Sequence, residues 1–128
     1  MLLQTITIAD DQYERAKRSV DFIQRYIFPG GSLSSIRVLE ESIARNSDMR
    51  LHHKEDIGLD YATTLSHWRK RIFARLADVR ALGYPETFIR MWEFYLCYCE
   101  GGFRERAISN AQLLLAKPAS QPLTDHER

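Results

Sequence analysis

The chain has 128 residues, enough for one small domain with its own hydrophobic core. Hydrophobic residues make up 45% of it, charged residues make up 27%, and the net charge is +1. This balance gives no overall attraction to nucleic acid or to a membrane surface, and we expect no nucleic-acid partner. No signal peptide is visible, and no apolar run approaches the roughly 20 residues of a membrane span.

The only cysteines, Cys97 and Cys99, are two positions apart. In a helix that spacing points the two side chains in different directions, so we expect no disulfide between them. No further cysteine completes a CxxC pair, which argues against a zinc site. A reducing, cytoplasmic compartment fits best.

The first quarter of the chain predicts a strand followed by helix. Residues 2–8 are β-branched and partly alternating, as in a strand. Residues 10–27 have helical spacing of apolar positions, in one piece or two, with Asp11 and Glu14 resembling a capping pair at the start. Pro29 and the glycines after it end this helix. Ser35 is a good N-cap for the next helix, predicted over residues 35–45.

The middle of the chain predicts a weak strand and then the longest helix. Residues 49–57 form the strand candidate, and its neighbouring His52 and His53 should face opposite sides, which is poor geometry for a metal pair and favours surface histidines. Asp60 is a plausible N-cap for a helix over residues 60–82. Gly83 is placed to end that helix, and Pro85 forbids its continuation.

The last third predicts a helix rich in aromatic residues over residues 86–106 and a final strand over residues 108–117. We therefore assign residues 1–118 to one domain and residues 119–128 to a polar tail. The order of elements is not a clean alternation of strands and helices. It resembles the second half of an α/β sheet with extra helices inserted.

The chain has no GxGxxG loop and no Ser/His/Asp set in a nucleophile context. Four basic side chains cluster on one predicted helix, and a solvated face is the favoured interpretation: Arg69, Lys70, Arg71 and Arg75. Tyr61 and Leu65 are four apart and share a helix face, as do Tyr95, Cys99 and Phe103. These two faces either line an apolar cavity that holds two hydroxyls or form a closed core, and spacing leaves both open.

Three segments, in order, carry a resemblance to a known family. They are FIQRYIFPGG from residue 22, EDIGLDYATTL from residue 55 and RMWEFYLCYCEGGFR from residue 90. They resemble the C-terminal part of the cyclopropane-fatty-acyl-phospholipid synthases, to which the mycolic acid cyclopropane synthases are related. The similarity runs over residues 2–117.

The resemblance implies a class I, Rossmann-like methyltransferase fold. It also implies an enzyme in which S-adenosylmethionine methylates the cis double bond of an unsaturated phospholipid acyl chain, and bound bicarbonate removes the proton that permits ring closure. Tyr61 matches the tyrosine that hydrogen-bonds bicarbonate. The positions that match the acyl-chain cavity are Phe28, Leu33, Leu65, Tyr95, Cys99, Phe103 and Ile108. Peripheral contact with the inner membrane surface is implied as well, and homo-oligomerisation stays open.

The departures from the family matter. Its methyl-donor site, and the cysteine, glutamate and histidine that complete the bicarbonate site, lie in an N-terminal half that these residues do not match. Ser34 stands where proline is usual, and Ser109-Asn110 where Gly-Asp is common.

We therefore expect a chain that is incomplete, inactive alone and without S-adenosylmethionine of its own. The alternatives are a non-catalytic lipid-binding or protein-interaction module, or a truncated product. The class I topology further implies that strands 2–8, 49–57 and 108–117 form one sheet, with the last strand antiparallel to the first.

Overall fold

The computed structural model describes residues 1–120, and its framework is a three-stranded sheet. The strands are β1 (Leu2–Ile8), β2 (Arg50–Asp56) and β3 (Ile108–Ala116), in the order β1-β3-β2. The last strand is thus central and antiparallel to both neighbours, with Leu2 opposite Leu114 in its register with β1. The prediction of one sheet, with the last strand antiparallel to the first, is confirmed.

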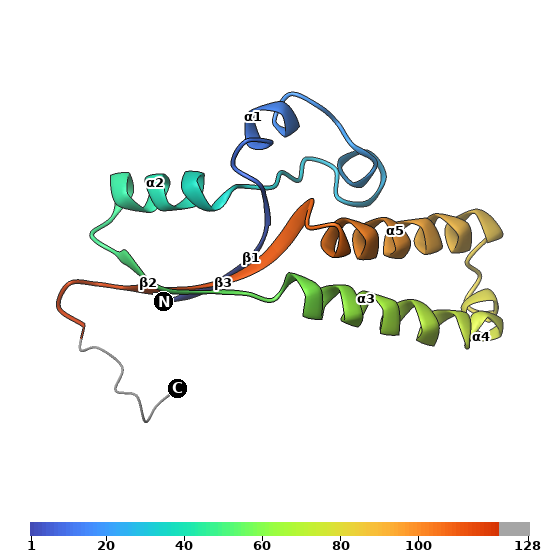
Figure 1. The fold of residues 1–128 in the computed structure, drawn as a ribbon. Coiled ribbons are helices and arrows are strands. Elements are labelled where there is room, and N and C mark those ends of the chain that lie inside the picture. The colour runs from blue at the N-terminus through green and yellow to red at the C-terminus, as the bar shows by residue number, and fades with distance from the viewer. Residues whose placement is uncertain (121–128) are drawn as a thin grey trace.

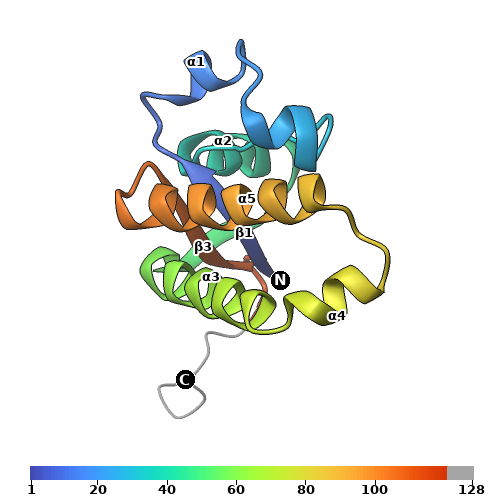
Figure 2. The same ribbon diagram turned by 90° about the vertical axis from the view of Figure 1, so that its right-hand side faces the viewer.

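The helices cover the sheet unequally. Figure 1 shows α2 (Ile36–Asn46) running along one face of the sheet, while α3 (Gly58–Phe73) and α5 (Glu86–Arg104) extend from one end of it. The view in Figure 2 shows α3 and α5 side by side, joined through the short α4 (Leu76–Ala81). None of the helices within residues 1–120 is both long and apolar enough to cross a membrane.

The core lies where α3 and α5 meet the sheet. Its fully buried members come from these two helices: Ala62, Leu65, Leu96 and Phe103. Ile6 of β1 and Ile108 of β3 pack against them, so residues from opposite ends of the sequence close the same core.

The segment between β1 and α2 is less helical than its sequence suggests. It contains only the single turn α1 (Tyr13–Ala16) and a π-helical turn, η1 (Ile23–Ile27). The predicted capping pair of Asp11 and Glu14 is wrong, because the start of α1 has no side-chain cap. A reciprocal pair of capping hydrogen bonds lies instead at η1. The backbone amide of Gln24 donates to the Asp21 carboxylate, and the backbone amide of Asp21 donates to the side-chain oxygen of Gln24.

Helix ends were predicted with mixed success. Ser35 does cap α2, accepting a hydrogen bond from the Val38 amide, and Gly83, at φ +88°, adopts the left-handed conformation of a helix stop. The predicted helix over residues 60–82 is wrong in length, because it breaks between Phe73 and Leu76. The apolar stripe runs through this break, so periodicity alone does not reveal it.

Strand β2 carries a bulge at the histidines. The register with β3 shifts between Leu51 and His53, which places two residues opposite one. His52 and His53 are both exposed, as predicted, although the bulge interrupts the strict alternation on which we based that prediction. Of the predicted tail over residues 119–128, residues 119–120 belong to a turn that follows β3, and residues 121–128 lie outside the described part of the chain.

Candidate functional site

Tyr61 lies in the first turn of α3, with its ring directed at the end of α5. The ring meets Phe103 edge to face at a centroid distance of 5.1 Å, and Trp68 in the same way at 6.0 Å. Such pairs stabilise a ring beyond the area that it buries. Tyr61 is half-buried, and it packs against the core rather than within it. Its position is therefore fixed while part of it stays accessible.

The α5 face that the sequence predicted forms the outer side of the core. We call it the α5 wall and define it by Tyr95, Cys99 and Phe103. Tyr95 and Cys99 are half-buried and Phe103 is fully buried, all three against the same cluster. Tyr95 extends this wall sideways, since its ring lies 5.0 Å from the Trp92 ring and 6.3 Å from the Phe28 ring. Helical spacing thus predicted which α5 residues share a side, but it did not indicate how deeply each is buried.

The remaining candidates divide into two groups. Leu65 is fully buried in the core, and Ile108 packs against the core from the start of β3. Leu33 lies apart, half-buried at the entry to α2, where its neighbour Ser34 bridges Thr7 of β1. Seven of the eight candidates, Leu33 excepted, therefore belong to the α3–α5 core or contact a residue that does.

This wall carries no charge at neutral pH. Burial, with smaller contributions from Cys99 and Tyr61, raises the pKa of Tyr95 to about 12. Burial, followed by the negative charge of Asp21, raises the pKa of the Cys99 thiol to about 11. Both groups stay protonated because the apolar surroundings disfavour their charged forms. The surface suits an uncharged ligand, and its thiol is a poor nucleophile.

The head of α3 is held by β3, and here the sequence prediction fails. Asp60 is not the N-cap, because the helix begins at Gly58, two residues earlier. The carboxylate of Asp56 accepts a hydrogen bond from the Gly58 amide at 2.9 Å and another from the Ser109 hydroxyl. The Ser109 bond, then the Gly58 bond, lowers the pKa of Asp56. An aspartate two residues before a glycine is the local signal that could have identified this turn.

Gly58 is required at this turn because β3 approaches closely. A methyl group at Gly58 would lie 2.5 Å from the Ser109 hydroxyl oxygen, closer than packed atoms come. The Ile57 amide also donates to the Asn110 carbonyl at 2.8 Å, so the first turn of α3 is attached directly to the central strand. Tyr61, whose amide donates to the Ile57 carbonyl, takes its position from that attachment.

A second polar contact ties α3 to α5. Glu100 accepts hydrogen bonds from Arg69 of α3 at 3.2 Å and from Arg104 at 3.0 Å, while its side chain is only 12% exposed. Burial alone would raise the pKa of Glu100, but the bonds from Arg104 and Arg69 outweigh it and lower the pKa. One of the four predicted solvated basic residues, Arg69, is therefore a structural ion-pair partner.

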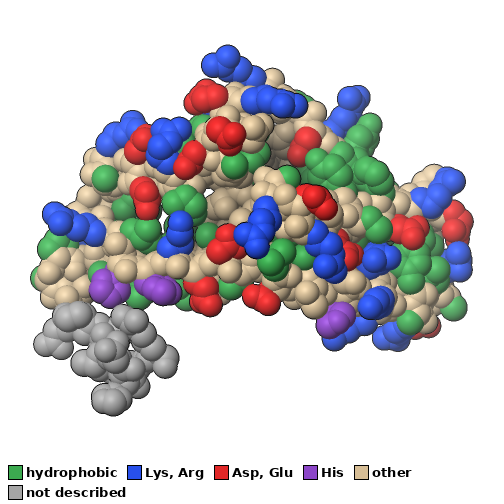
Figure 3. Space-filling model, in the orientation of Figure 1, with side chains coloured by type: hydrophobic (Ala, Val, Ile, Leu, Met, Phe, Trp, Pro, Cys, Tyr) green, Lys and Arg blue, Asp and Glu red, His purple; other side chains and the backbone are tan. Residues whose placement is uncertain are grey.

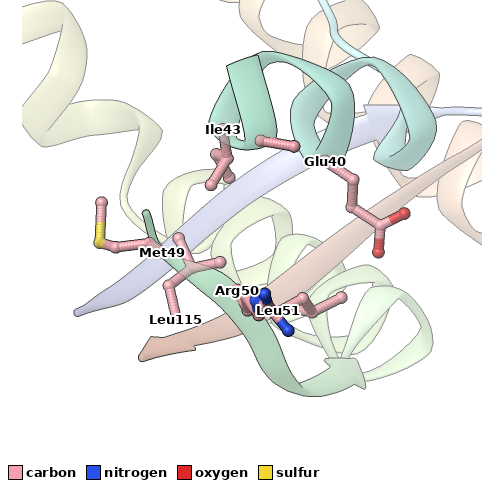
Figure 4. Close-up of a pocket in the computed structure, with 7 residues that line it drawn as sticks. Glu40, Ile43, Met49, Arg50, Leu51 and Leu115 are labelled. Carbon is pink, nitrogen blue, oxygen red and sulfur yellow. The ribbon is translucent and has the colours of Figure 1, made fainter. Parts of the chain in front are cut away.

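The two described cavities lie elsewhere. The first, of about 240 Å³, sits between α2 and the end of the sheet, with Ile43, Leu51 and Leu115 among its lining residues (Figure 4). The second adjoins the same end of the sheet. None of the eight candidates lines either cavity. Within residues 1–120, no group of three or more acidic, histidine or cysteine side chains is arranged to hold a metal ion.

Comparison with known proteins gives one consistent family. The family model "Mycolic acid cyclopropane synthetase" matches residues 1–113. Tuberculostearic acid methyltransferase UfaA1 of Mycobacterium tuberculosis is 36% identical over 102 residues, which are 80% of this chain and 24% of that protein. Cyclopropane-fatty-acyl-phospholipid synthase of Escherichia coli K12 is 38% identical over 96 residues, which are 75% of this chain and 24% of that protein.

Solved structures agree. Mycolic acid cyclopropane synthase CmaA1, complexed with SAH and CTAB, superposes with a TM-score of 0.79 at 29% identity, covering 91% of this chain and 44% of that one. The cyclopropane synthase MmaA2 of Mycobacterium tuberculosis gives a TM-score of 0.77. The fold and these matches show that the chain has the structure of one part of a cyclopropane synthase. The chain belongs to the mycolic acid cyclopropane synthetase family, and it spans about a quarter of the length of these two curated relatives.

Proposed function

We propose that this chain acts as the C-terminal part of a cyclopropane-fatty-acyl-phospholipid synthase, within a class I methyltransferase fold. In that role, α3 and α5 supply part of the pocket for an unsaturated acyl chain, and Tyr61 binds the bicarbonate base. S-adenosylmethionine would be bound by a partner segment that carries the glycine-rich loop which this sequence lacks. A cytoplasmic location follows from the proposed substrate and cofactor.

The observation that carries this proposal is the meeting of Tyr61 with the uncharged α5 wall. The ring meets Phe103 and Trp68 edge to face, while the residue stays partly accessible. The neighbouring Tyr95 and Cys99 stay protonated far above neutral pH. A base placed by the Tyr61 hydroxyl would therefore lie beside an apolar surface, which is where an alkene must be held dry during methyl transfer.

The chain's own groups would contribute orientation, exclusion of water and placement of a proton acceptor. The faces of the Tyr61 and Trp68 rings would stabilise a developing carbocation. The hydroxyl of Tyr61 would donate to bicarbonate and hold it within reach of the departing proton. S-adenosylmethionine, when bound, supplies the methyl group.

The test is a chimera. The 96-residue matching segment of the Escherichia coli synthase is replaced by the corresponding segment of this chain, and cyclopropane fatty acids are measured by gas chromatography in cells without their own synthase. We expect product from the chimera. Tyr61→Phe should lower turnover by about 10-fold or more at a stability cost of about 1 kcal/mol.

Tyr84→Phe is the matched control, because this tyrosine is exposed, stacks on Phe88 and lies outside the α3–α5 core. It should leave turnover unchanged. A folded chimera with normal turnover in the Tyr61→Phe form, at limiting as well as saturating bicarbonate, would remove Tyr61 from the site. A folded chimera without product would favour the non-catalytic alternative.

A further inference from the structure

Residues 11–33, which connect β1 to α2, lie on the outside of the domain. We name them the lid segment. Figures 1 and 2 show this segment arching over α5, with the turns α1 and η1 inside it. Among residues 1–120, its hydrogen bonds and ion pairs join it only to itself and to Ala9. In this part of the chain, no directional bond therefore holds the lid segment to the helices or to the sheet.

Both ends of the lid segment are fixed to the rest of the domain. The Ile8 amide donates to the Ser34 carbonyl at 3.1 Å, and Ser34 forms a β-bridge with Thr7. At the same place, the Asp10 carboxylate accepts a hydrogen bond from the Arg37 amide at 3.2 Å. The segment thus resembles a long Ω-loop, whose ends lie close together. Its middle can swing about these fixed ends while β1 and α2 stay in place.

Three ring contacts join the middle of the lid segment to α5. Phe22 meets Phe94 edge to face at a centroid distance of 4.7 Å and lies 6.0 Å from the Tyr98 ring. Phe28 meets the Tyr95 ring edge to face at 6.3 Å. Figure 3 shows hydrophobic side chains gathered where the segment meets α5. The attachment is therefore apolar, and apolar contacts are non-directional.

The lid segment is also only shallowly buried. No residue of α1 or η1 is fully buried, and Phe28 is 57% exposed. The turn η1 is π-helical, closed by the bond from the Phe28 amide to the Ile23 carbonyl, and turns of this rare kind occur frequently at functional sites. Segments with few buried contacts open at a small part of the free energy that unfolds the whole domain. The lid segment can therefore leave α5 while the rest of the chain stays folded.

The closed lid segment covers part of the α5 wall. The Phe28 ring contacts the Tyr95 ring, and Asp21 lies near enough to Cys99 for its charge to add to burial in raising the pKa of that thiol. Opening would bring Tyr95 and Cys99 into contact with water and leave Phe103 in the core.

We propose that the lid segment opens from α5 and closes over the α5 wall, and that Phe22 is the side chain that holds it closed. The purpose of this motion rests on the proposed function, because closing would exclude water during methyl transfer and opening would admit the acyl chain. The opening itself requires neither substrate nor catalysis, so it is tested on the full chain alone.

The two cysteines provide the measurement. Cys99 is half-buried beneath the lid segment, and Cys97 is exposed on the same helix, so the rate at which iodoacetamide labels Cys97 is the reference. We expect Phe22→Ser to label Cys99 about 10-fold faster than the unchanged chain does, because serine removes a half-buried ring from the contact. The rate at Cys97 should stay the same. Peptide mass spectrometry gives both rates at one pH.

Two control variants separate lid opening from other causes. Tyr84→Ser removes an exposed ring that stacks on Phe88, outside the contacts of the lid segment. Gly58→Ala crowds Ser109 at the head of α3, which destabilises the domain without a change in the lid segment. Neither should alter the labelling of Cys99. Circular dichroism of each variant shows whether it is folded.

A double-mutant cycle tests whether the contact of Phe22 with Phe94 holds the lid segment closed. Phe94→Ser removes the ring on the α5 side and should also accelerate the labelling of Cys99. The double variant Phe22→Ser/Phe94→Ser should label Cys99 well short of the product of the two single effects, because the same contact is lost only once.

Three results would overturn the proposal. An unchanged rate at Cys99 in folded Phe22→Ser would mean that the lid segment does not cover the thiol. A similar acceleration in Gly58→Ala would mean that the reagent reaches Cys99 through unfolding of the whole domain. Independent effects of Phe22→Ser and Phe94→Ser would show that their contact does not hold the segment. The proposed function is judged separately, because Tyr61→Phe should label Cys99 at the unchanged rate whatever its turnover in the chimera.

Discussion

The close approach of β3 to the head of α3 predicts an unusual cost for one added methyl group. In Gly58→Ala, the new methyl would lie 2.5 Å from the Ser109 hydroxyl oxygen and 3.1 Å from the Asp56 carboxylate oxygen. Gly58 has no left-handed φ, so the substitution meets crowding rather than backbone strain. The Ser109 hydroxyl must rotate away, which breaks its hydrogen bond to Asp56.

The expected magnitude follows from two opposed effects. Alanine in place of glycine favours the helix by about 0.5–1 kcal/mol. Loss of a charge-assisted hydrogen bond at this half-buried turn costs about 1.5–2 kcal/mol, toward the lower end because Asp56 stays in contact with solvent. The net destabilisation should be about 1 kcal/mol. Gly101→Ala, where nothing lies within 4 Å of the added methyl, should instead stabilise by about 0.5–1 kcal/mol.

The assay is urea denaturation followed by circular dichroism, with Ser109→Ala as the second arm of a double-mutant cycle. In the Ser109→Ala background there is no hydroxyl to displace, so Gly58→Ala should be neutral or slightly stabilising. The two substitutions should couple by about 1–2 kcal/mol. Equal or greater stability for Gly58→Ala when Ser109 is present would refute the reasoning.

The pH dependence provides a second check on the same turn. The folded-state pKa of Asp56 lies below its ordinary value of 3.8. Its contribution to stability is therefore present above that value and is lost as the pH falls through the folded-state pKa. The difference between the unchanged chain and Ser109→Ala should accordingly shrink below a pH of about 3.8.

Two further predictions concern α5. Glu100→Gln should destabilise the fold by about 1–2 kcal/mol in the same urea assay. Glu41→Gln is the control, because Glu41 also bridges two arginines but is 44% exposed. It should cost under about 0.5 kcal/mol. Because the pKa of Glu100 is lowered, the cost of Glu100→Gln should fade as the pH drops below its ordinary value of 4.5, and a constant cost down to strong acid would contradict it. Iodoacetamide near neutral pH should label exposed Cys97 about 100-fold faster than Cys99, because burial raises the pKa of Cys99 to about 11. Peptide mass spectrometry would measure the two rates. Equal labelling would mean that the α5 wall opens.

Features set by neighbours in sequence were largely predictable. The strands depend on the alternation of apolar and polar residues, and the cap at Ser35 depends on one side chain next to its own helix. The structure confirms both. The shared face of Tyr95, Cys99 and Phe103 depends only on helical geometry. A single sheet with its last strand antiparallel to the first was predicted as well, but from the family resemblance rather than from the residues, and the strand order was not predicted.

Features set by distant contacts were not predictable. Helix α3 begins at Gly58 rather than at Asp60, and the reason is a contact with Ser109, fifty-one positions after Gly58. The Ser109 hydroxyl fixes Asp56 by a hydrogen bond and leaves no room for a side chain at position 58. The ring contact between Phe22 and Phe94 joins two distant segments of the chain, and the residue pattern of neither segment indicates that they meet. Burial depth is likewise a tertiary property, which is why Phe103 is closed in the core while Tyr95, two turns earlier on the same face, is half open.

The placement of Tyr61 follows from these distant contacts. Its amide bonds to the Ile57 carbonyl, and the Ile57 amide bonds to the Asn110 carbonyl, so the tyrosine is joined to β3 through a short chain of backbone groups. Its ring meets Phe103 of α5 edge to face. The backbone of Tyr61 is therefore supported by β3, and its ring is supported by α5. Substitutions at Ser109 should alter turnover of the proposed enzyme through the orientation of Tyr61, while the α5 wall, which α5 carries on its own, stays as it is.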